Sequence, residues 1–305
     1  MEDLVVRALD RLVPGGVQRG ELRRENRMVR WVEAGAGRPA VVLDAALGEP
    51  GSLAWAGVMP LVAPRARVLA YDRAGIGASD PASPLTLAAQ VADLAAVAGA
   101  TGGRCVLVGH SWGALLAQLA ALTYPELVAG LVLVDPAEED FLAALPPARH
   151  QQEIANGQVI IDQYANGTLP GTVRETFRSF ARHLTADEQL QALILDAYVS
   201  CYAKQSQARM VGDEWRLVVD SLPVIRRSRA EASLPDVPVV VFSATTGHPR
   251  QEREMWTGFH ARLAASVPRG THVVLADTSH ATNQERPAEI AAAINRIVED
   301  LDPAQ

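Results

Sequence analysis

Cysteine, lysine and long apolar runs are scarce or missing in this sequence of 305 residues. The two cysteines, Cys105 and Cys201, lie far apart and match no disulfide or metal-binding spacing, so we expect two buried, unreactive thiols and a reducing, cytoplasmic environment. No uninterrupted apolar run reaches the roughly 18 residues that a membrane span requires. The N-terminal segment is amphipathic with acidic residues at its start, unlike a signal peptide. These absences predict a protein that is neither secreted nor embedded in a membrane.

Clusters of positive charge are missing as well. The net charge is −7 and the arginines are scattered, with Lys204 as the only lysine, so the chain offers no patch for a phosphate backbone. The turn around Gly75 and Gly77 lacks the third glycine and the following helix of a dinucleotide-binding loop. We therefore expect a small-molecule substrate, with no cofactor, no metal, no nucleic acid and no membrane as partner. The sequence predicts no particular oligomeric state.

Short apolar runs alternate with helix-forming stretches in two parts of the chain, residues 1–136 and 235–305. This alternation is typical of buried parallel strands connected by helices. The sequence therefore predicts an α/β core with a mostly parallel sheet, and a short helix at residues 53–62. The strands are expected at residues 18–26, 28–34, 40–44, 66–71, 104–108, 131–134, 237–242 and 272–275.

Residues 137–234 interrupt the alternation. They contain several amphipathic helical stretches and no convincing strand. A helical block between two α/β segments is typical of a lid over the carboxyl edge of the sheet, where such sheets bind ligands. We therefore expect residues 137–234 to form a helical cap on the core, with a purely structural excursion as the alternative.

The pentapeptide Gly109-His110-Ser111-Trp112-Gly113 carries the first candidate for chemistry. It follows the apolar run of residues 105–108 and leads into the helix-forming stretch of residues 114–120. In a tight turn between a strand and a helix, this spacing forces the serine into a strained conformation that only small neighbours tolerate, and lifts its hydroxyl above the sheet edge. Ser111 is therefore a candidate nucleophile.

A serine hydroxyl is a poor nucleophile at neutral pH, so it needs a base within hydrogen-bond reach and a third group to orient that base. Of the seven histidines, His280 lies in the loop between the last predicted strand and the last helix, on the strand-end rim that carries Ser111. His110 adjoins Ser111 along the backbone and cannot easily reach the same reaction site, so we expect it to be a buried supporting residue. His280 is the candidate base.

With these features the chain resembles the α/β-hydrolase superfamily over residues 28–136 and 236–300. The resemblance rests on the Ser111 turn, the glycine-rich turn at residues 71–80, the strand end at residues 131–136 and the His280 loop. It implies an eight-stranded sheet with helices on both faces and a cap inserted after the sixth strand. It also implies that serine, acid and histidine follow one another in this order along the chain.

The resemblance leaves the acid open. Most relatives carry it two or three residues past a glycine that follows the seventh strand, but here Gly247 is followed by His248, Pro249 and Arg250. A minority, including some haloalkane dehalogenases, carry the acid at the end of the sixth strand, where this chain has Asp135. We favour Asp135, with Glu252 and then Glu138 or Glu139 as alternatives. Asp277 is expected to be a turn residue, and Asp72 to brace its own turn with Arg73.

An oxyanion hole needs two backbone N–H groups aimed at the developing negative charge. In the family that this chain resembles, one donor is the residue after the nucleophile, here Trp112. The other comes from the first strand–helix loop, where many relatives have His-Gly but this chain reads Asp44-Ala45-Ala46-Leu47-Gly48. Aligning Ala45-Ala46 with that pair makes Leu47 the second donor, within one residue.

A serine nucleophile disfavours the dehalogenase and epoxide-hydrolase chemistries, because these need an alkyl ester on a carboxylate. We therefore expect hydrolysis of a carboxylic ester or lactone, or of a thioester, in a small and fairly apolar molecule, through an acyl-enzyme on Ser111. One alternative is an aminopeptidase resembling prolyl aminopeptidases, and another is a non-catalytic ligand-binding protein. Some large side chains of the helical block could line a pocket or only fill a core: Phe141, Leu142, Tyr198, Tyr202 and Trp215.

Overall fold

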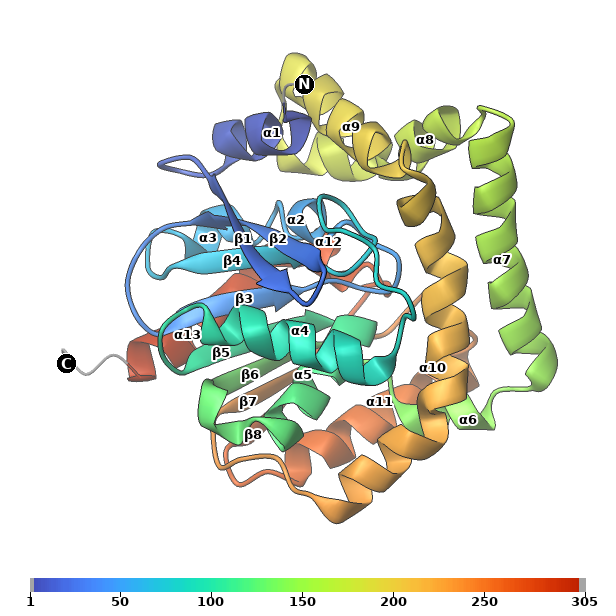
Figure 1. The fold of residues 1–305 in the computed structure, drawn as a ribbon. Coiled ribbons are helices and arrows are strands. Elements are labelled where there is room, and N and C mark those ends of the chain that lie inside the picture. The colour runs from blue at the N-terminus through green and yellow to red at the C-terminus, as the bar shows by residue number, and fades with distance from the viewer. Residues whose placement is uncertain (1–2, 302–305) are drawn as a thin grey trace.

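An eight-stranded sheet forms the centre of the computed structural model, which describes residues 3–301 (Figure 1). The strand order is β1-β2-β4-β3-β5-β6-β7-β8, with β2 antiparallel to β1 and β4 and every other pair parallel. The predicted fold class is therefore confirmed. The strands are β1 (Gln18–Arg24), β2 (Arg27–Ala34), β3 (Ala40–Asp44), β4 (Val68–Asp72), β5 (Cys105–His110), β6 (Val128–Val134), β7 (Val239–Ala244) and β8 (Gly270–Leu275).

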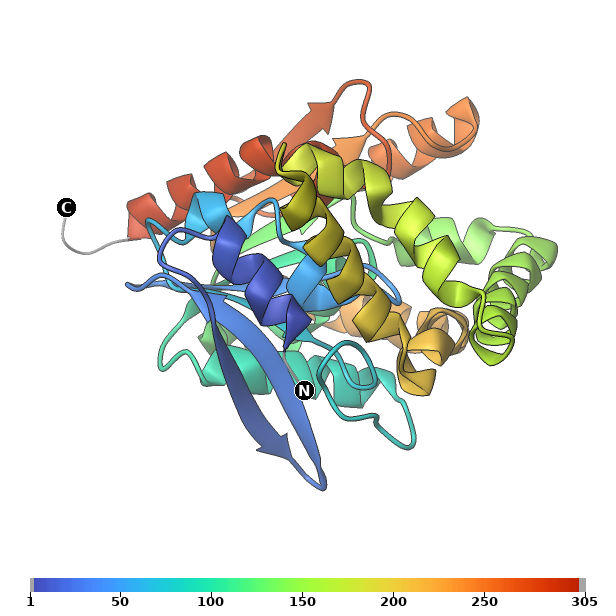
Figure 2. The same cartoon turned by 90° about the horizontal axis from the view of Figure 1, so that it is seen from above.

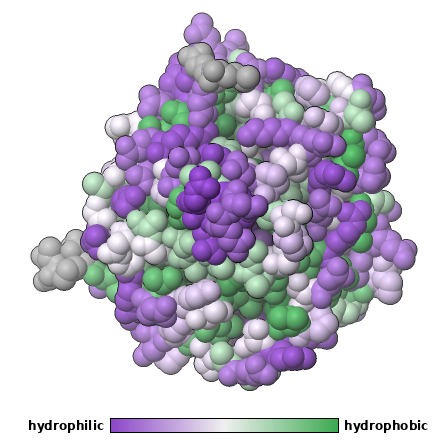
Figure 3. Space-filling view, in the orientation of Figure 1, coloured by the Kyte–Doolittle hydropathy of each residue, from purple (hydrophilic) through white to green (hydrophobic). Residues whose placement is uncertain are grey.

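Helices cover both faces of the sheet. On one face lie α4 (Leu87–Gly99), α5 (Trp112–Thr123) and α11 (Arg250–Ala265), and the other face packs against α13 (Pro287–Leu301). Strands β3 to β6 are buried along their whole length, because water reaches neither face of these apolar segments. On the molecular surface in the same view, hydrophilic and hydrophobic residues are interspersed (Figure 3).

Two segments near the N-terminus differ from a simple strand–helix alternation. The helix predicted at residues 53–62 is wrong, because the segment forms two short helices, α2 (Gly51–Ala54) and α3 (Met59–Val62). Pro60 fits the first turn of α3, where its missing N–H leaves no hydrogen bond unmade. Before the sheet, α1 (Leu4–Leu12) begins where the Asp3 carboxylate accepts a hydrogen bond from the Val6 N–H.

The segment between β6 and β7 folds into helices that lie beside the carboxyl ends of the strands (Figure 1). Its two longest helices pack closely, because a Cβ added to Gly157 would come within 2.5 Å of the Gly212 Cα. Further along the segment, α9 lies next to α1 (Figure 2). The helices are α6 (Glu139–Ala144), α7 (Pro147–Ala165), α8 (Leu169–Leu184), α9 (Glu188–Tyr202) and α10 (Gln205–Glu231).

The predicted core ranges include residues 1–2 and 302–305, which lie outside the described residues. Among residues 3–301, none of the helices combines the length and the apolar character needed to cross a membrane.

Candidate active site

Ser111 occupies a strained turn between β5 and α5. Its backbone has φ 53° and ψ −114°, a conformation that residues other than glycine rarely adopt. A Cβ on Gly109 would lie 2.4 Å from Ala114, and one on Gly113 would lie 2.5 Å from the Ala45 carbonyl oxygen. Both glycines are therefore required by close backbone approach, which is the local reason for the Gly-x-Ser-x-Gly spacing.

His280 contacts both Ser111 and Asp135. Its Nε2 lies 2.9 Å from Ser111 Oγ, and its Nδ1 lies 2.6 Å from Asp135 Oδ2. Because an ionised carboxylate only accepts hydrogen bonds, Nδ1 carries the proton and Nε2 is free to accept the serine proton. The His280 side chain is one-third exposed, at 33%, whereas Asp135 is fully buried. This arrangement can transfer the Ser111 hydroxyl proton to His280 Nε2 while Nδ1 stays hydrogen-bonded to Asp135.

Asp135 lies just beyond the end of β6, in a backbone conformation with φ 41°. Its carboxylate also accepts hydrogen bonds from the Ala244 N–H at 3.0 Å and from Arg253 Nη1 at 3.0 and 2.9 Å. Burial by itself would raise the pKa of this carboxyl. The hydrogen bond and charge of His280, together with the charge of Arg253, outweigh burial and hold the pKa of Asp135 well below its usual range.

His110 supports the loop that carries His280. Its Nε2–H donates to the backbone carbonyl of His280 at 2.7 Å, and the two rings lie 4.9 Å apart. The side chain is buried, and burial lowers the pKa of His110 to about 3. The ring is therefore neutral at physiological pH.

The other candidate acids have other partners. Glu252 lies 3.7 Å from His248, Glu138 accepts the backbone N–H groups of Asp140 and Phe141, and Glu139 pairs with Arg229 at 2.7 Å. Asp277 has φ 52°, as expected of a turn residue.

The turn after β4 requires a correction. Asp72 does brace it, accepting hydrogen bonds from Ser52 and from the Ala78 N–H. The expected pairing of Asp72 with Arg73 is wrong, because Arg73 instead binds Asp44 and Glu214, whose two carboxylates offer the buried guanidinium charged acceptors.

The two predicted oxyanion donors, Trp112 and Leu47, lie at the same cavity as Ser111. Trp112 is the first residue of α5, where backbone N–H groups have no acceptor within the helix. Leu47 lies in the loop between β3 and α2. Both N–H groups thus belong to segments that border Ser111.

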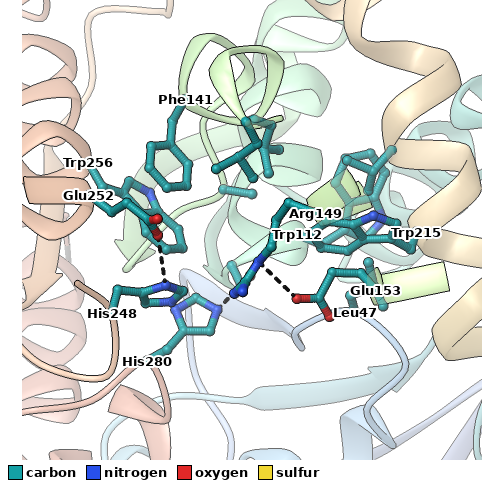
Figure 4. A pocket seen from close by; sticks show the side chains of 15 residues that line it. Leu47, Trp112, Phe141, Arg149, Glu153, Trp215, His248, Glu252, Trp256 and His280 are labelled. Atoms are coloured by element: carbon teal, nitrogen blue, oxygen red, sulfur yellow. Dashed lines mark hydrogen bonds and ion pairs between the residues drawn. The ribbon is translucent and has the colours of Figure 1, made fainter. Parts of the chain in front are cut away.

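A largely apolar cavity of about 210 Å³ opens over Ser111 and His280 (Figure 4). Of the large side chains singled out in the helical segment, Phe141, Leu142 and Trp215 line it. Tyr198 does not, and stacks on Phe177 at 3.8 Å between ring centroids. The full lining consists of Leu47, Ser111, Trp112, Ala137, Phe141, Leu142, Leu145, Arg149, Glu153, Trp215, Val218, His248, Glu252, Trp256 and His280.

Several polar residues at the site were missed by the sequence analysis. Arg149 and Glu153 form an ion pair of 3.4 Å in the cavity wall, at a spacing of four residues that places them on one side of α7. Arg253 binds Asp135 from α11 and stacks over Trp256. The spacing of Arg149 and Glu153 could have indicated their pairing, but nothing in the sequence links Arg253 to Asp135, which is 118 residues away.

Cys105 and Cys201 are both free and buried. Burial raises the pKa of both Cys105 and Cys201 to about 12, so neither is a thiolate at neutral pH. Within residues 3–301, no three histidine, cysteine, aspartate or glutamate side chains are grouped so that they could hold a metal ion.

Residues 10–293 match the model of the alpha/beta hydrolase family. The chain is 24% identical to a haloalkane dehalogenase of Sphingobium indicum, over 92% of this chain and 95% of that protein. It is 35% identical over 130 residues to the polyketide synthase ThaQ of Burkholderia thailandensis, and this match spans 42% of the chain but only 6% of ThaQ. The crystal structure of Cfl2 from Burkholderia cenocepacia has a similar fold, with a TM-score of 0.73, 24% identity, and coverage of 93% of this chain and 96% of Cfl2.

Proposed function

The chain belongs to the alpha/beta hydrolase family, and we propose that within it the protein is a serine hydrolase of carboxylic esters or lactones, or of thioesters. The observation that carries this proposal is the pair of His280 contacts, 2.9 Å to Ser111 Oγ and 2.6 Å to Asp135 Oδ2. Such a serine, histidine and carboxylate series activates the hydroxyl for attack on an acyl carbon.

A serine at position 111 argues against the reactions named for some relatives, haloalkane dehalogenase and epoxide hydrolase. Attack of a serine hydroxyl on a saturated carbon would leave an ether, which water does not readily cleave. Attack on an acyl carbon leaves an ester, which a second, base-assisted attack by water can open. The residue type at the turn therefore favours acyl transfer.

In the proposed mechanism, Ser111 Oγ attacks the acyl carbon while His280 Nε2 takes the hydroxyl proton. The carbonyl oxygen becomes negatively charged and accepts hydrogen bonds from the Trp112 and Leu47 N–H groups, and losing one such donor typically costs about 3–4 kcal/mol in the barrier. His280 then returns its proton to the leaving oxygen or sulfur, and the acyl group stays on Ser111. Water attacks the acyl-enzyme with His280 again as base, which releases the acid and restores Ser111.

The helical segment suggests the type of substrate. We assign residues 137–234 the role of a cap, because Phe141, Leu142 and Trp215 from its helices line the cavity above Ser111. A cavity of about 210 Å³ with mostly apolar walls suits a small, fairly apolar acyl or alkyl group.

A second candidate, aminopeptidase activity, is favoured by one observation. The carboxylates of Glu153 and Glu252 line the cavity and could bind a substrate amine. We rank it second because each already has a partner, Arg149 for Glu153 and His248 for Glu252. A third reading, a ligand-binding protein without catalysis, predicts a ligand-induced rise in melting temperature without turnover.

The test is hydrolysis of short-chain p-nitrophenyl esters by the wild-type chain and by Ser111→Ala. We expect turnover by the wild type and its loss in the variant, with fluorophosphonate labelling of Ser111 in the wild type alone. Unchanged turnover in Ser111→Ala would sink the proposal. Release of naphthylamine from aminoacyl-naphthylamides, without ester turnover, would favour the aminopeptidase instead.

A further inference from the structure

A second charged cluster lies beneath the loop that carries Leu47. Its centre is Arg73, which is 2% exposed and donates five hydrogen bonds from the turn after β4. Two of them reach backbone carbonyl oxygens of the loop, Ala45 and Ala46, each at 2.7 Å. The other three reach carboxylates, Asp44 at 2.6 Å and both oxygens of Glu214 at 2.7 and 2.8 Å.

The bond to the Ala46 carbonyl bears directly on the predicted donor. The Ala46 C=O and the Leu47 N–H belong to one planar, trans peptide group, so they point in opposite directions. Holding the oxygen at Arg73 therefore aims the Leu47 N–H away from the cluster. Arg73 Nη2, which holds that oxygen, also donates to Glu214 Oε2 at 2.8 Å, so the carboxylate sets where the guanidinium lies.

Glu214 also holds the other side of Leu47. This fully buried residue of α10 accepts a hydrogen bond from the Gly48 N–H at 2.7 Å. The Gly48 carbonyl is in turn held by Gln207 Nε2, also from α10, at 2.8 Å. The peptide groups before and after Leu47 are thus both fixed, the first by Arg73 and the second directly by Glu214 of α10, which also binds Arg73.

The same carboxylate is connected to the residue that carries the other predicted donor. Gln90 Nε2 donates to Glu214 Oε1 at 2.6 Å, and Gln90 Oε1 accepts from the Trp112 indole N–H at 2.9 Å. Gln90 and Trp112 are each 1% exposed. Glu214 is thereby linked to Leu47 through Gly48 and Arg73, and to Trp112 through Gln90.

We propose that Glu214 is a positioning residue for the oxyanion hole, which it holds in shape from the helical segment by fixing the peptide groups around Leu47 and the side chain of Trp112. This inference rests on the proposed function. It means that α10 does more than border the cavity, because the geometry of the two N–H donors depends on the position of that helix.

If Glu214 only stabilised the fold, its substitution would lower the melting temperature without a specific loss of kcat. Buried ion pairs often add little net stability compared with apolar groups of the same shape, so the presence of this cluster is weak support for a stabilising role alone. The chain offers a matched comparison in Asp93, a buried carboxylate that pairs with Arg27 at 2.7 Å and with Arg24 at 3.2 Å. Asp93 makes these pairs with the end of β1 and the start of β2, away from the cavity lining.

The experiment compares Glu214→Gln with Asp93→Asn in the full chain. Steady-state ester hydrolysis and the affinity of an alkyl boronic acid, which forms a tetrahedral adduct on the nucleophile, are measured together with the melting temperature. For Glu214→Gln we expect kcat and boronate affinity to fall together by about 10- to 100-fold, with KM changed by less than about threefold, since a displaced donor weakens only the tetrahedral state. For Asp93→Asn we expect a lower melting temperature with kcat and boronate affinity close to wild type.

If Glu214→Gln does not fold, the variant Gln90→Met tests the inference instead. This substitution keeps the volume but removes the link to Trp112, and we expect boronate affinity to fall by about three- to tenfold. Wild-type boronate affinity in a folded Glu214→Gln or, failing that, in Gln90→Met overturns the inference, as does an equal loss of kcat in Asp93→Asn. If the wild-type chain shows neither ester turnover nor boronate binding, the proposed function itself fails, and that result is distinct because it precedes any variant.

Discussion

Two buried clusters at the carboxyl edge of the sheet have the same components, a carboxylate and an arginine, and differ in what surrounds them. In one, Asp135 binds Arg253 and the partly exposed ring of His280. In the other, Glu214 and Asp44 bind Arg73, and the remaining partners are Gln90, Tyr71 and backbone groups. All three nitrogens of the Arg73 guanidinium have acceptors, whereas Arg253 Nε and Nη2 are buried without one.

The difference separates a cluster that can do chemistry from one that can hold a shape. His280, the partner of Asp135, lines the cavity and contacts Ser111 Oγ, so a proton can pass between the imidazole and the hydroxyl. The partners of Glu214 are an arginine, an amide and a backbone N–H, which keep their protons at neutral pH, and none of them lines the cavity over Ser111. A buried charge thus serves a reaction only where one of its partners can change its protonation state and touch a substrate.

The largest expected effect comes from removing the charge of Asp135. In Asp135→Asn the amide can no longer hold His280 in the tautomer that accepts the serine proton, and we expect kcat to fall by about 10⁴-fold with little change in KM. Glu139→Gln is the matched control, because Glu139 pairs with Arg229 and lies outside the cavity lining, and its kcat is expected within about twofold of wild type. Equal losses in ester turnover would mean that Asp135 is not the acid.

The next effect is on stability and contrasts the two arginines. Arg73→Met leaves two buried carboxylates, Asp44 and Glu214, without their counter-charge, and breaking such a buried pair costs about 3–5 kcal/mol. Arg253→Met leaves Asp135 its hydrogen bonds from His280 and Ala244, so we expect a loss of about 1–3 kcal/mol. Urea denaturation measures both. A larger loss for Arg253→Met would reverse the assignment of the two clusters.

The smallest effect is a difference of sign in the pH dependence of stability. Because the pKa of Asp135 is lowered in the folded protein, its contribution is present above pH about 4 and is lost on acidification through the lower folded pKa. Burial raises the pKa of Asp44, although the charge of Arg73 opposes the rise. The contribution of Asp44 to the free energy of unfolding is therefore present below pH about 4 and is lost as the pH rises through the raised folded pKa.

Chemical denaturation of wild type, Asp135→Asn and Asp44→Asn between pH about 2 and 7 tests this. The free energy of unfolding that wild type gains over Asp135→Asn should rise with pH, and the gain over Asp44→Asn should fall, each by at most about 1.4 kcal/mol per pH unit. If both differences in the free energy of unfolding changed with pH in the same direction, the expected opposite signs for Asp135 and Asp44 would be wrong.

Local patterns were sufficient for the turn and for the sheet. The glycines flanking Ser111 are required by backbone approaches of 2.4 and 2.5 Å, which any sequence with this turn must satisfy. The apolar runs of β3 to β6 are buried on both faces, so their composition alone marked them. The break between α2 and α3 was missed because helical spacing continues across it, while Gly57 packs against Pro287 from the far end of the chain.

Contacts between distant segments could not be predicted from local sequence patterns. Asp135 was favoured only on the resemblance to a minority of relatives, and its contact with His280 joins residues 145 positions apart. Arg73 was assigned to its neighbour Asp72, yet it binds Glu214, which is 141 positions away, because α10 brings a second carboxylate to a guanidinium that is already buried. Nothing in the local sequence reports which helix will cover that turn.

By itself the sequence determined the strained serine turn, the mostly parallel sheet and the place where a helical segment interrupts it, because each depends on residue types that are neighbours in the chain. Only the tertiary structure decided which carboxylate meets His280, which side chains wall the cavity, and that Glu214 joins α10 to the loop of Leu47. Those outcomes depend on how helices and strand ends meet in space, where burial selects the partner of each charge.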